Sequence, residues 1–268
     1  MPLFFNRNRK LLYIHVPKCA GTSVEKHLKR HSDFSFLFHK TSEHDFRCNP
    51  QHFHAPLLKQ MIHDVETIPS FMIVRHPILR VMSEHGYQKT QGYSGNIQFE
   101  AHVRRFFFRY SFDPFTYDNH IRPQSEFYLK TTKVFRLEEG LKRPLEFCNS
   151  ILIPEENRMI EESSSPKVNM SNQDEYTITG RTVNSVQNFY DADFTLFGYQ
   201  KLKIDDGEVI SSSELKQEIK THKLGKLKDD EASQGASLVA FKQAKVLPAL
   251  NKTLSLTTRI FKGIEKLI

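Results

Sequence analysis

The 268-residue sequence has few cysteines and lacks any long apolar run. Its three cysteines are widely spaced, which argues against a disulfide framework and favours a reducing compartment. No stretch of 18 apolar residues occurs, and residues 1–10 lack the hydrophobic segment of a signal peptide. These absences predict no membrane-spanning segment and a cytoplasmic location.

Two common motif classes are also missing. The net charge of +7 would suit a nucleic-acid-binding protein, but residues 238–268 carry +5 of it and no nucleic-acid-binding motif accompanies the charge. We therefore expect no nucleic-acid partner. No loop has the Gly-x-x-x-x-Gly-Lys-Ser/Thr order of a standard nucleotide triphosphatase, since Lys18 precedes the nearest glycine by three residues.

A first candidate phosphate loop follows an apolar run near the N-terminus. Residues 11–16 have the length and composition of a strand, and Gly21-Thr22-Ser23 should open a helix that continues through residue 30. A helix that starts after a tight loop directs unpaired N–H groups at an anion. Lys18 adds a charge to this loop. The alternative is an ordinary strand-to-helix turn with a surface lysine.

A second segment repeats this pattern. Residues 71–74 predict a buried strand, Pro77 suits a first helical turn, and residues 79–89 predict a helix. Arg75 and Ser83 can then converge on one anion, because Arg supplies a fork of donors and Ser a hydroxyl.

The two segments together resemble the donor-binding loops of sulfotransferases that use PAPS (3′-phosphoadenosine 5′-phosphosulfate), especially the branch that modifies carbohydrates. Pro-Lys-x-x-Gly-Thr-Ser resembles the 5′-phosphosulfate loop, and Arg-x-Pro-x-x-Arg-x-x-Ser-x-x-x-Tyr resembles the 3′-phosphate segment. Residues 118–124, 134–138 and 183–199 extend the resemblance over residues 11–199. It implies these donor-binding residues: Lys18, Cys19, Ala20, Gly21, Thr22, Ser23, Arg75 and Ser83. Cys19 departs from the family, which usually has Thr or another small residue there.

The alternation of strands and helices predicts an α/β fold, with a P-loop-like parallel sheet flanked by helices and a helical C-terminal extension. We expect a catalytic domain at residues 1–200, a polar connector at 201–237 and a basic amphipathic tail at 238–268. The tail predicts either a helix packed on the domain or a partner, or attachment to an anionic membrane surface.

Sulfuryl transfer needs a cation for the departing phosphate and a base for the acceptor hydroxyl. We assign the first role to Lys18. A base with a pKa near neutrality favours histidine, and His54 matches the position at which the carbohydrate branch places one. His52 and His120 are weaker candidates for contact with the acceptor, which the resemblance implies is a glycan or a related hydroxyl compound.

The histidines are also candidates for a metal site. Cys48, His52 and His54, with His44 upstream, have spacing that could bind zinc. No Cys-x-x-Cys or His-Glu-x-x-His motif supports that interpretation, so we expect no metal. Magnesium is also not required, since the transferred group carries less charge than a phosphoryl group. Two other functions stay open at this stage: a kinase-like phosphoryl transferase, and a non-catalytic protein that binds a nucleotide or a glycan.

Overall fold

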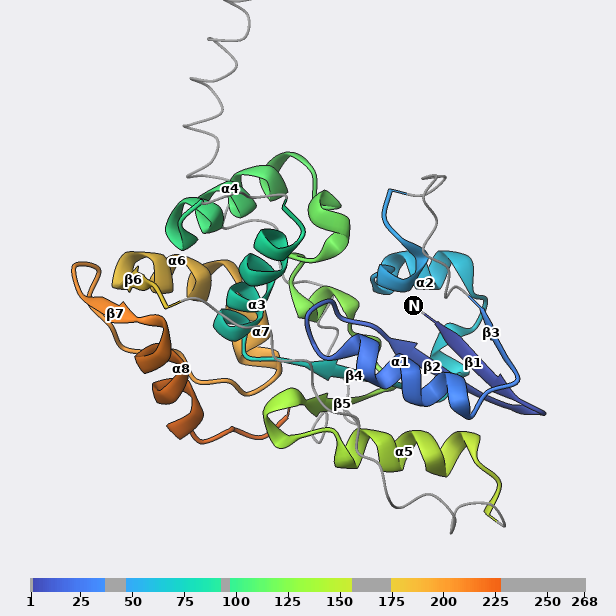
Figure 1. Cartoon of the computed structure of the whole chain (residues 1–268). Coiled ribbons are helices and arrows are strands. Elements are labelled where there is room, and N and C mark those ends of the chain that lie inside the picture. Colours follow the sequence, from blue (N-terminus) through green and yellow to red (C-terminus); the bar gives the residue numbers. More distant parts are fainter. Residues whose placement is uncertain (1, 37–46, 93–96, 156–174, 228–268) are drawn as a thin grey trace, which may run out of the picture. The chain divides into compact units, whose positions relative to one another are not determined.

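The computed structural model describes residues 2–36, 47–92, 97–155 and 175–227. These residues belong to one compact unit, Met1–Asp230 (Figure 1). The residues of a second unit, Glu231–Ile268, are not among those described. The expected basic tail therefore also lies outside the described residues.

The core is a five-stranded sheet with the order β3-β1-β2-β4-β5. Strands β2, β4 and β5 are parallel, whereas β1 pairs antiparallel with both β2 and β3. The α/β expectation is confirmed. The N-terminal hairpin that adds β1 was not expected. The strands are β1 (Leu3–Asn6), β2 (Arg9–Ile14), β3 (Phe34–Phe36), β4 (Ser70–Val74) and β5 (Thr132–Arg136).

Helices cover the sheet on both faces, as Figure 1 shows, and α1 and α5 pack together on one of them. The α-helices of this sheet region are α1 (Gly21–Arg30), α2 (Ala55–Met61), α3 (Pro77–Thr90), α4 (Phe99–Phe112), α5 (Lys142–Leu152), α6 (Gly180–Phe189) and α7 (Asp191–Leu196). Short 3₁₀ turns lie between them: η1 (Pro50–His52), η2 (Val65–Thr67), η3 (Thr116–Asn119), η4 (Gln124–Phe127) and η5 (Leu137–Glu139).

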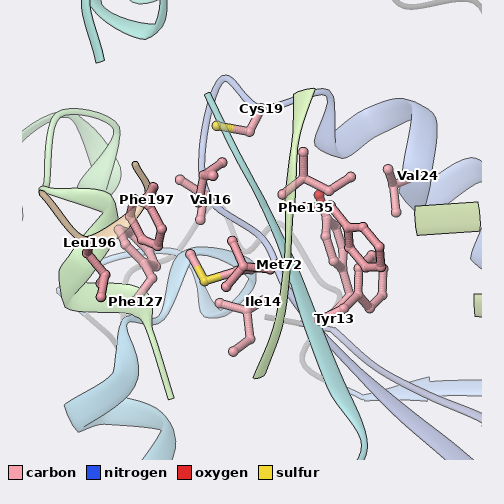
Figure 2. Close-up of a cluster of buried hydrophobic side chains, with 14 of the residues drawn as sticks. Tyr13, Ile14, Val16, Cys19, Val24, Met72, Phe127, Phe135, Leu196 and Phe197 are labelled. Carbon is pink, nitrogen blue, oxygen red and sulfur yellow. The ribbon is translucent and has the colours of Figure 1, made fainter. Parts of the chain in front are cut away.

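The alternation of side chains along the parallel strands gives the sheet two apolar faces. Tyr13 and Ile14 are neighbours in β2 but lie on opposite sides of the sheet in Figure 2. Tyr13 stacks on Phe71 at 4.8 Å between ring centroids and belongs to the face that α1 and α5 cover. Ile14 and Met72 lie on the other face, with side chains from η4 and α7. Both faces are buried, so the strands read as continuous apolar runs.

Residues 201–227 form more structure than the expected connector. Strand β7 (Val209–Ser211) pairs with β6 (Thr177–Thr179), and α8 (Ser212–Thr221) follows. Ser211 and Glu214 form a reciprocal cap at the start of α8, and Leu215 and Ile219 bury its apolar stripe. A capping box and an i, i+4 apolar pair thus stabilise a packed helix within the expected connector, and the domain boundary expected at residue 200 stays a prediction.

In the part of the chain that the structure describes, none of the helices combines the length and hydrophobicity that crossing a membrane requires.

Two buried histidines predict that the protein loses stability in acid. Burial lowers the pKa of His52 and of His76 to about 3 from an ordinary value of 6.5. The unfolded chain then binds protons that the folded chain excludes, so stability falls as the pH decreases below 6.5. Each such group contributes up to about 1.4 kcal/mol per pH unit.

His76→Leu should make this loss smaller, because the His76 ring packs between Phe194 and Tyr199 and an apolar side chain suits that position. We expect the free energy of unfolding, measured by urea titration, to fall less between pH 7.5 and pH 5 than in the wild type. His63→Leu is the control, since the His63 side chain is 96% exposed. Equal slopes in all three proteins would contradict the prediction.

Candidate functional site

The loop between β2 and α1 has the backbone of an anion cradle. Lys18 and Ala20 both adopt left-handed backbone angles, with φ of 68° and 63°. Such angles cost a non-glycine residue about 1–2 kcal/mol, and they cluster at functional sites. Helix α1 begins directly afterwards at Gly21, and none of the described side chains caps it. The Ser23 N–H already bonds the Ala20 carbonyl at 3.1 Å, so among the described residues the N–H groups of Gly21 and Thr22 are the ones available to a bound anion.

Two cations meet at this loop. The Arg75 guanidinium, at the end of β4, donates from one Nη to the Lys18 carbonyl oxygen at 3.4 Å. Burial lowers the pKa of Lys18, a change that Arg75 reinforces and Glu84 opposes. Nζ of Lys18 lies 3.9 Å from the centroid of the Tyr87 ring. Two like charges held together in a partly desolvated loop favour the binding of an anion.

Gln124 holds this arrangement in place. Its Oε1 accepts the Arg75 backbone N–H at 2.9 Å, and its Nε2 donates to the Arg75 carbonyl at 2.8 Å. The Cys19 thiol donates to the same Oε1 at 3.4 Å. Asp193 accepts the backbone N–H groups of Gln124 and Ser125. The amide of Gln124 thus fastens the end of β4 to the cradle loop.

Arg80 forms a second connection. This residue is 1% exposed on α3. Its Nε donates to the Pro17 carbonyl at 3.0 Å and one Nη donates to the His120 carbonyl at 2.7 Å. The cradle loop and the loop that carries His120 are therefore joined through one buried guanidinium.

The remaining predicted donor-binding residues lie on the two helices that follow these strands. Thr22 is exposed and Ser23 is buried in the first turn of α1. Ser83 is half-buried in the second turn of α3. Among the described residues, the structure joins Lys18, Cys19 and Arg75 through hydrogen bonds but does not join Ser83 to Arg75 in this way.

A cluster of three histidines lies beside the cradle. The ring of His52 is 5.0 Å from that of His15 and 5.0 Å from that of His120, between centroids. Each Nδ1 faces a carboxylate: Glu25 at 2.6 Å from His15, Asp118 at 2.8 Å from His52 and Glu84 at 2.8 Å from His120. The carboxylates fix Nδ1 as the protonated nitrogen and leave Nε2 of each ring as an acceptor.

His54 lies outside this cluster of rings. It precedes α2 and is 8% exposed. Its ring contacts that of Phe115 at 5.6 Å between centroids, and its Nδ1 has no hydrogen-bond partner in the described part of the chain. Burial, with a smaller effect of Arg122, lowers the pKa of His54 to about 4. Its assignment as the base stays a prediction.

The residues that could hold a metal ion differ from the set that the sequence spacing offered. His52, Asp118 and His120 each offer an atom within 4.8 Å of the others. Nδ1 of His52 is bonded to Asp118, however, and its Nε2 lies 3.1 Å from Nε2 of Gln51. A metal could use His52 only by breaking one of these bonds. Cys48 accepts a hydrogen bond from Asn119, and His44 lies outside the described residues.

Sequence reasoning missed the side chains that position the site. Gln124 lies in the matched segment 118–124, but its side-chain clamp on Arg75 spans 49 positions. Glu84 and Tyr87 also lie on α3, after Ser83. Glu84 is buried and follows Arg80 by four residues, and this pairing of charged residues on one helix was a usable signal of a polar site. Glu138, at the end of the matched segment 134–138, accepts the His76 backbone N–H and the Tyr199 hydroxyl.

The comparisons with known proteins agree with this geometry. A family profile described as "Sulfotransferase family" matches residues 1–200. No curated protein and no solved structure matches the chain. The fold and the family profile together define a transferase. The chain belongs to the sulfotransferase family.

Gly21→Ala should disrupt the cradle. A Cβ at this position would lie 2.0 Å from Nε2 of His15, and the hydrogen bond from His15 to Glu25 restrains that ring. We expect the change to cost about 1–3 kcal/mol of stability. It should also weaken binding of PAP, the desulfated donor, at least tenfold by calorimetry.

Gly207→Ala is the matched control for this change, because a Cβ there has no atom within 4 Å among the described residues. It should change stability by less than about 0.5 kcal/mol and leave PAP affinity intact. Equal effects of the two substitutions would contradict the role given to Gly21.

Proposed function

We propose that the protein transfers a sulfuryl group from PAPS to a hydroxyl of a glycan or related acceptor and releases PAP. The main observation that supports this proposal is the pair Lys18 and Arg75 at the carboxyl ends of β2 and β4. The Arg75 guanidinium holds the pair together by its hydrogen bond to the Lys18 carbonyl. Ligands of parallel α/β sheets bind at this edge. A donor with phosphates at both its 5′ and 3′ positions offers one anionic group for each cation.

The parts of the cradle suit different steps of such a transfer. The first turn of α1 and Lys18 would hold the 5′-phosphosulfate. As the S–O bond breaks, negative charge grows on the 5′-phosphate, and Lys18 and the helix N–H groups stabilise it. Arg75 and Ser83 would bind the 3′-phosphate. A histidine would accept the proton of the hydroxyl, for which His54 is the prediction from the sequence.

The two other functions have less support. A kinase-like activity on this sheet would need the lysine next to a glycine and a hydroxyl for magnesium, whereas Lys18 is followed by Cys19 and Ala20. A binding protein without activity would not need histidines with fixed Nδ1 protons beside the cradle. All three cysteines are free and buried, which fits the cytoplasmic location expected from the sequence.

Two variants separate the two phosphate sites. Arg75→Ala should weaken PAP binding about 10- to 100-fold, since a hydrogen bond to a charged group contributes about 1.5–3 kcal/mol. It should change the affinity for AMP, which has no 3′-phosphate, less than threefold. Lys18→Met should weaken both ligands by a similar factor. Titration calorimetry measures all four values. Equal losses of affinity for PAP and AMP in Arg75→Ala would show that Arg75 does not bind the 3′-phosphate.

The activity itself is tested with labelled PAPS. We expect wild-type protein to bind PAP more tightly than ATP and to label a glycan acceptor or, more slowly, to release sulfate to water. Lys18→Met should lower turnover at saturating PAPS by about 100-fold or more, because it removes charge stabilisation that matters most in the transition state. Tight ATP binding without PAP binding would refute the proposed function.

A further inference from the structure

His120, directly after η3, and Glu84, on α3, form a carboxylate–histidine pair. Nδ1 of His120 lies 2.8 Å from Oε2 of Glu84. The Glu84 side chain is 1% exposed, and that of His120 is 13% exposed. Gln88 donates to the other carboxylate oxygen of Glu84 at 2.5 Å. Burial alone would raise the pKa of Glu84, but His120, Lys18 and Gln88 hold it below its ordinary value, so the carboxylate is charged.

The neighbouring histidines differ from His120 in what their ring nitrogens contact. Nε2 of His15 fills the space over Gly21, where a Cβ would lie 2.0 Å from it. Nε2 of His52 faces the amide of Gln51 at 3.1 Å. Among the described residues, Nε2 of His120 has no hydrogen-bond partner, and His120 is the most exposed of these three rings. His120 can therefore accept a proton from a molecule outside the protein.

The same helix face links His120 to the leaving-group end of the cradle. Glu84 and Tyr87 are three residues apart on α3 and share a face. Glu84 interacts electrostatically with Lys18, and Lys18 lies over the Tyr87 ring. The Tyr87 ring is 5.6 Å from that of His120 between centroids. Lys18 and His120 thus both contact one aromatic ring, and Glu84 interacts with both of them.

We propose, on the basis of the sulfotransferase function above, that His120 is the general base and that Glu84 is its positioning residue. Nε2 of His120 takes the proton from the acceptor hydroxyl while the hydroxyl oxygen forms a bond to the sulfur of PAPS. The bond from sulfur to the bridging phosphate oxygen breaks, and its electron pair stays on the phosphate of PAP. The imidazolium formed on His120 keeps its Nδ1 proton bonded to Glu84.

Glu84 serves this step in two ways. Its negative charge stabilises the imidazolium that forms, while its hydrogen bond keeps Nδ1 protonated and Nε2 free. It also lies near Lys18, so the charge it carries favours a protonated lysine before the donor binds. Two further ionisable groups beside His120, His52 and Asp118, are bonded to each other.

The tautomer is the first test, and it needs no acceptor. Long-range ¹H–¹⁵N spectra of histidine-labelled protein report which ring nitrogen carries the proton. The His120→Asn variant identifies the His120 signals. We expect the Nδ1-protonated form in the wild type and a mixture of tautomers in Glu84→Gln. A wild-type His120 protonated mainly at Nε2 would overturn the proposal, as would zinc retained at one per chain and bound to this nitrogen.

The kinetic test compares His120→Asn, Glu84→Gln, the double variant and His54→Asn. The assay follows transfer from labelled PAPS to desulfated heparin, with sulfate release to water as a second readout. His120→Asn and Glu84→Gln should each lower kcat about 10- to 1000-fold. PAP affinity should change less than threefold in His120→Asn, which separates lost chemistry from a lost fold. Because the two residues act as a unit, the double variant should be no slower than His120→Asn.

The outcomes separate this proposal from the proposed function. Absence of PAP binding and of any sulfuryl transfer in the wild type would remove the function and the base together. Transfer that survives in His120→Asn but is lost in His54→Asn would overturn only the assignment of His120 and support the prediction from the sequence. Additive losses in the double variant would overturn the role of Glu84 as the partner of His120.

Discussion

The site depends on the buried amide of Gln124. This side chain has no exposed surface and bonds both the N–H and the carbonyl of Arg75. A side-chain amide that bonds both groups of one peptide substitutes for a neighbouring strand at the point where β4 ends. Asp193, whose pKa burial raises, accepts two consecutive backbone N–H groups and fixes the turn that carries Gln124. The position of Arg75 therefore follows from this clamp.

The clamp explains how the cradle tolerates unfavourable features. Lys18 and Ala20 hold left-handed angles, and Lys18 and Arg75 bring like charges together. Each feature costs free energy that a bound anion would offset. The loop is bonded to Gln124 through Cys19 and to Arg80 through Pro17. Lys18 and Arg75 therefore cannot reduce their repulsion by moving apart. An anionic donor bound there would meet a preorganised site, and little of its binding free energy would be used to order the loop.

Much of the fold could be predicted from the sequence, because the parallel strands are buried on both faces and read as apolar runs. The β1–β2 hairpin was missed since its turn uses Arg7 with φ of 54°, where glycine or asparagine is the usual signal. The loops that follow β2 and β4 could be predicted because one short segment forms each of them, and their role in donor binding stays a prediction. The His120–Glu84 pair, 36 positions apart, depends on how α3 packs, and no local pattern encodes that distance.

Cys19 shows why a departure from the family pattern need not change the chemistry. Burial raises the pKa of the Cys19 thiol to about 12, so the sulfur stays protonated at neutral pH. A thiolate at this position would cancel part of the charge that Lys18 and Arg75 bring to the cradle. As a neutral thiol it donates to Gln124, as a hydroxyl would. The same Oε1 accepts the stronger bond from the Arg75 N–H. The weaker sulfur donor therefore costs the clamp little, and the electrostatics of the cradle are preserved.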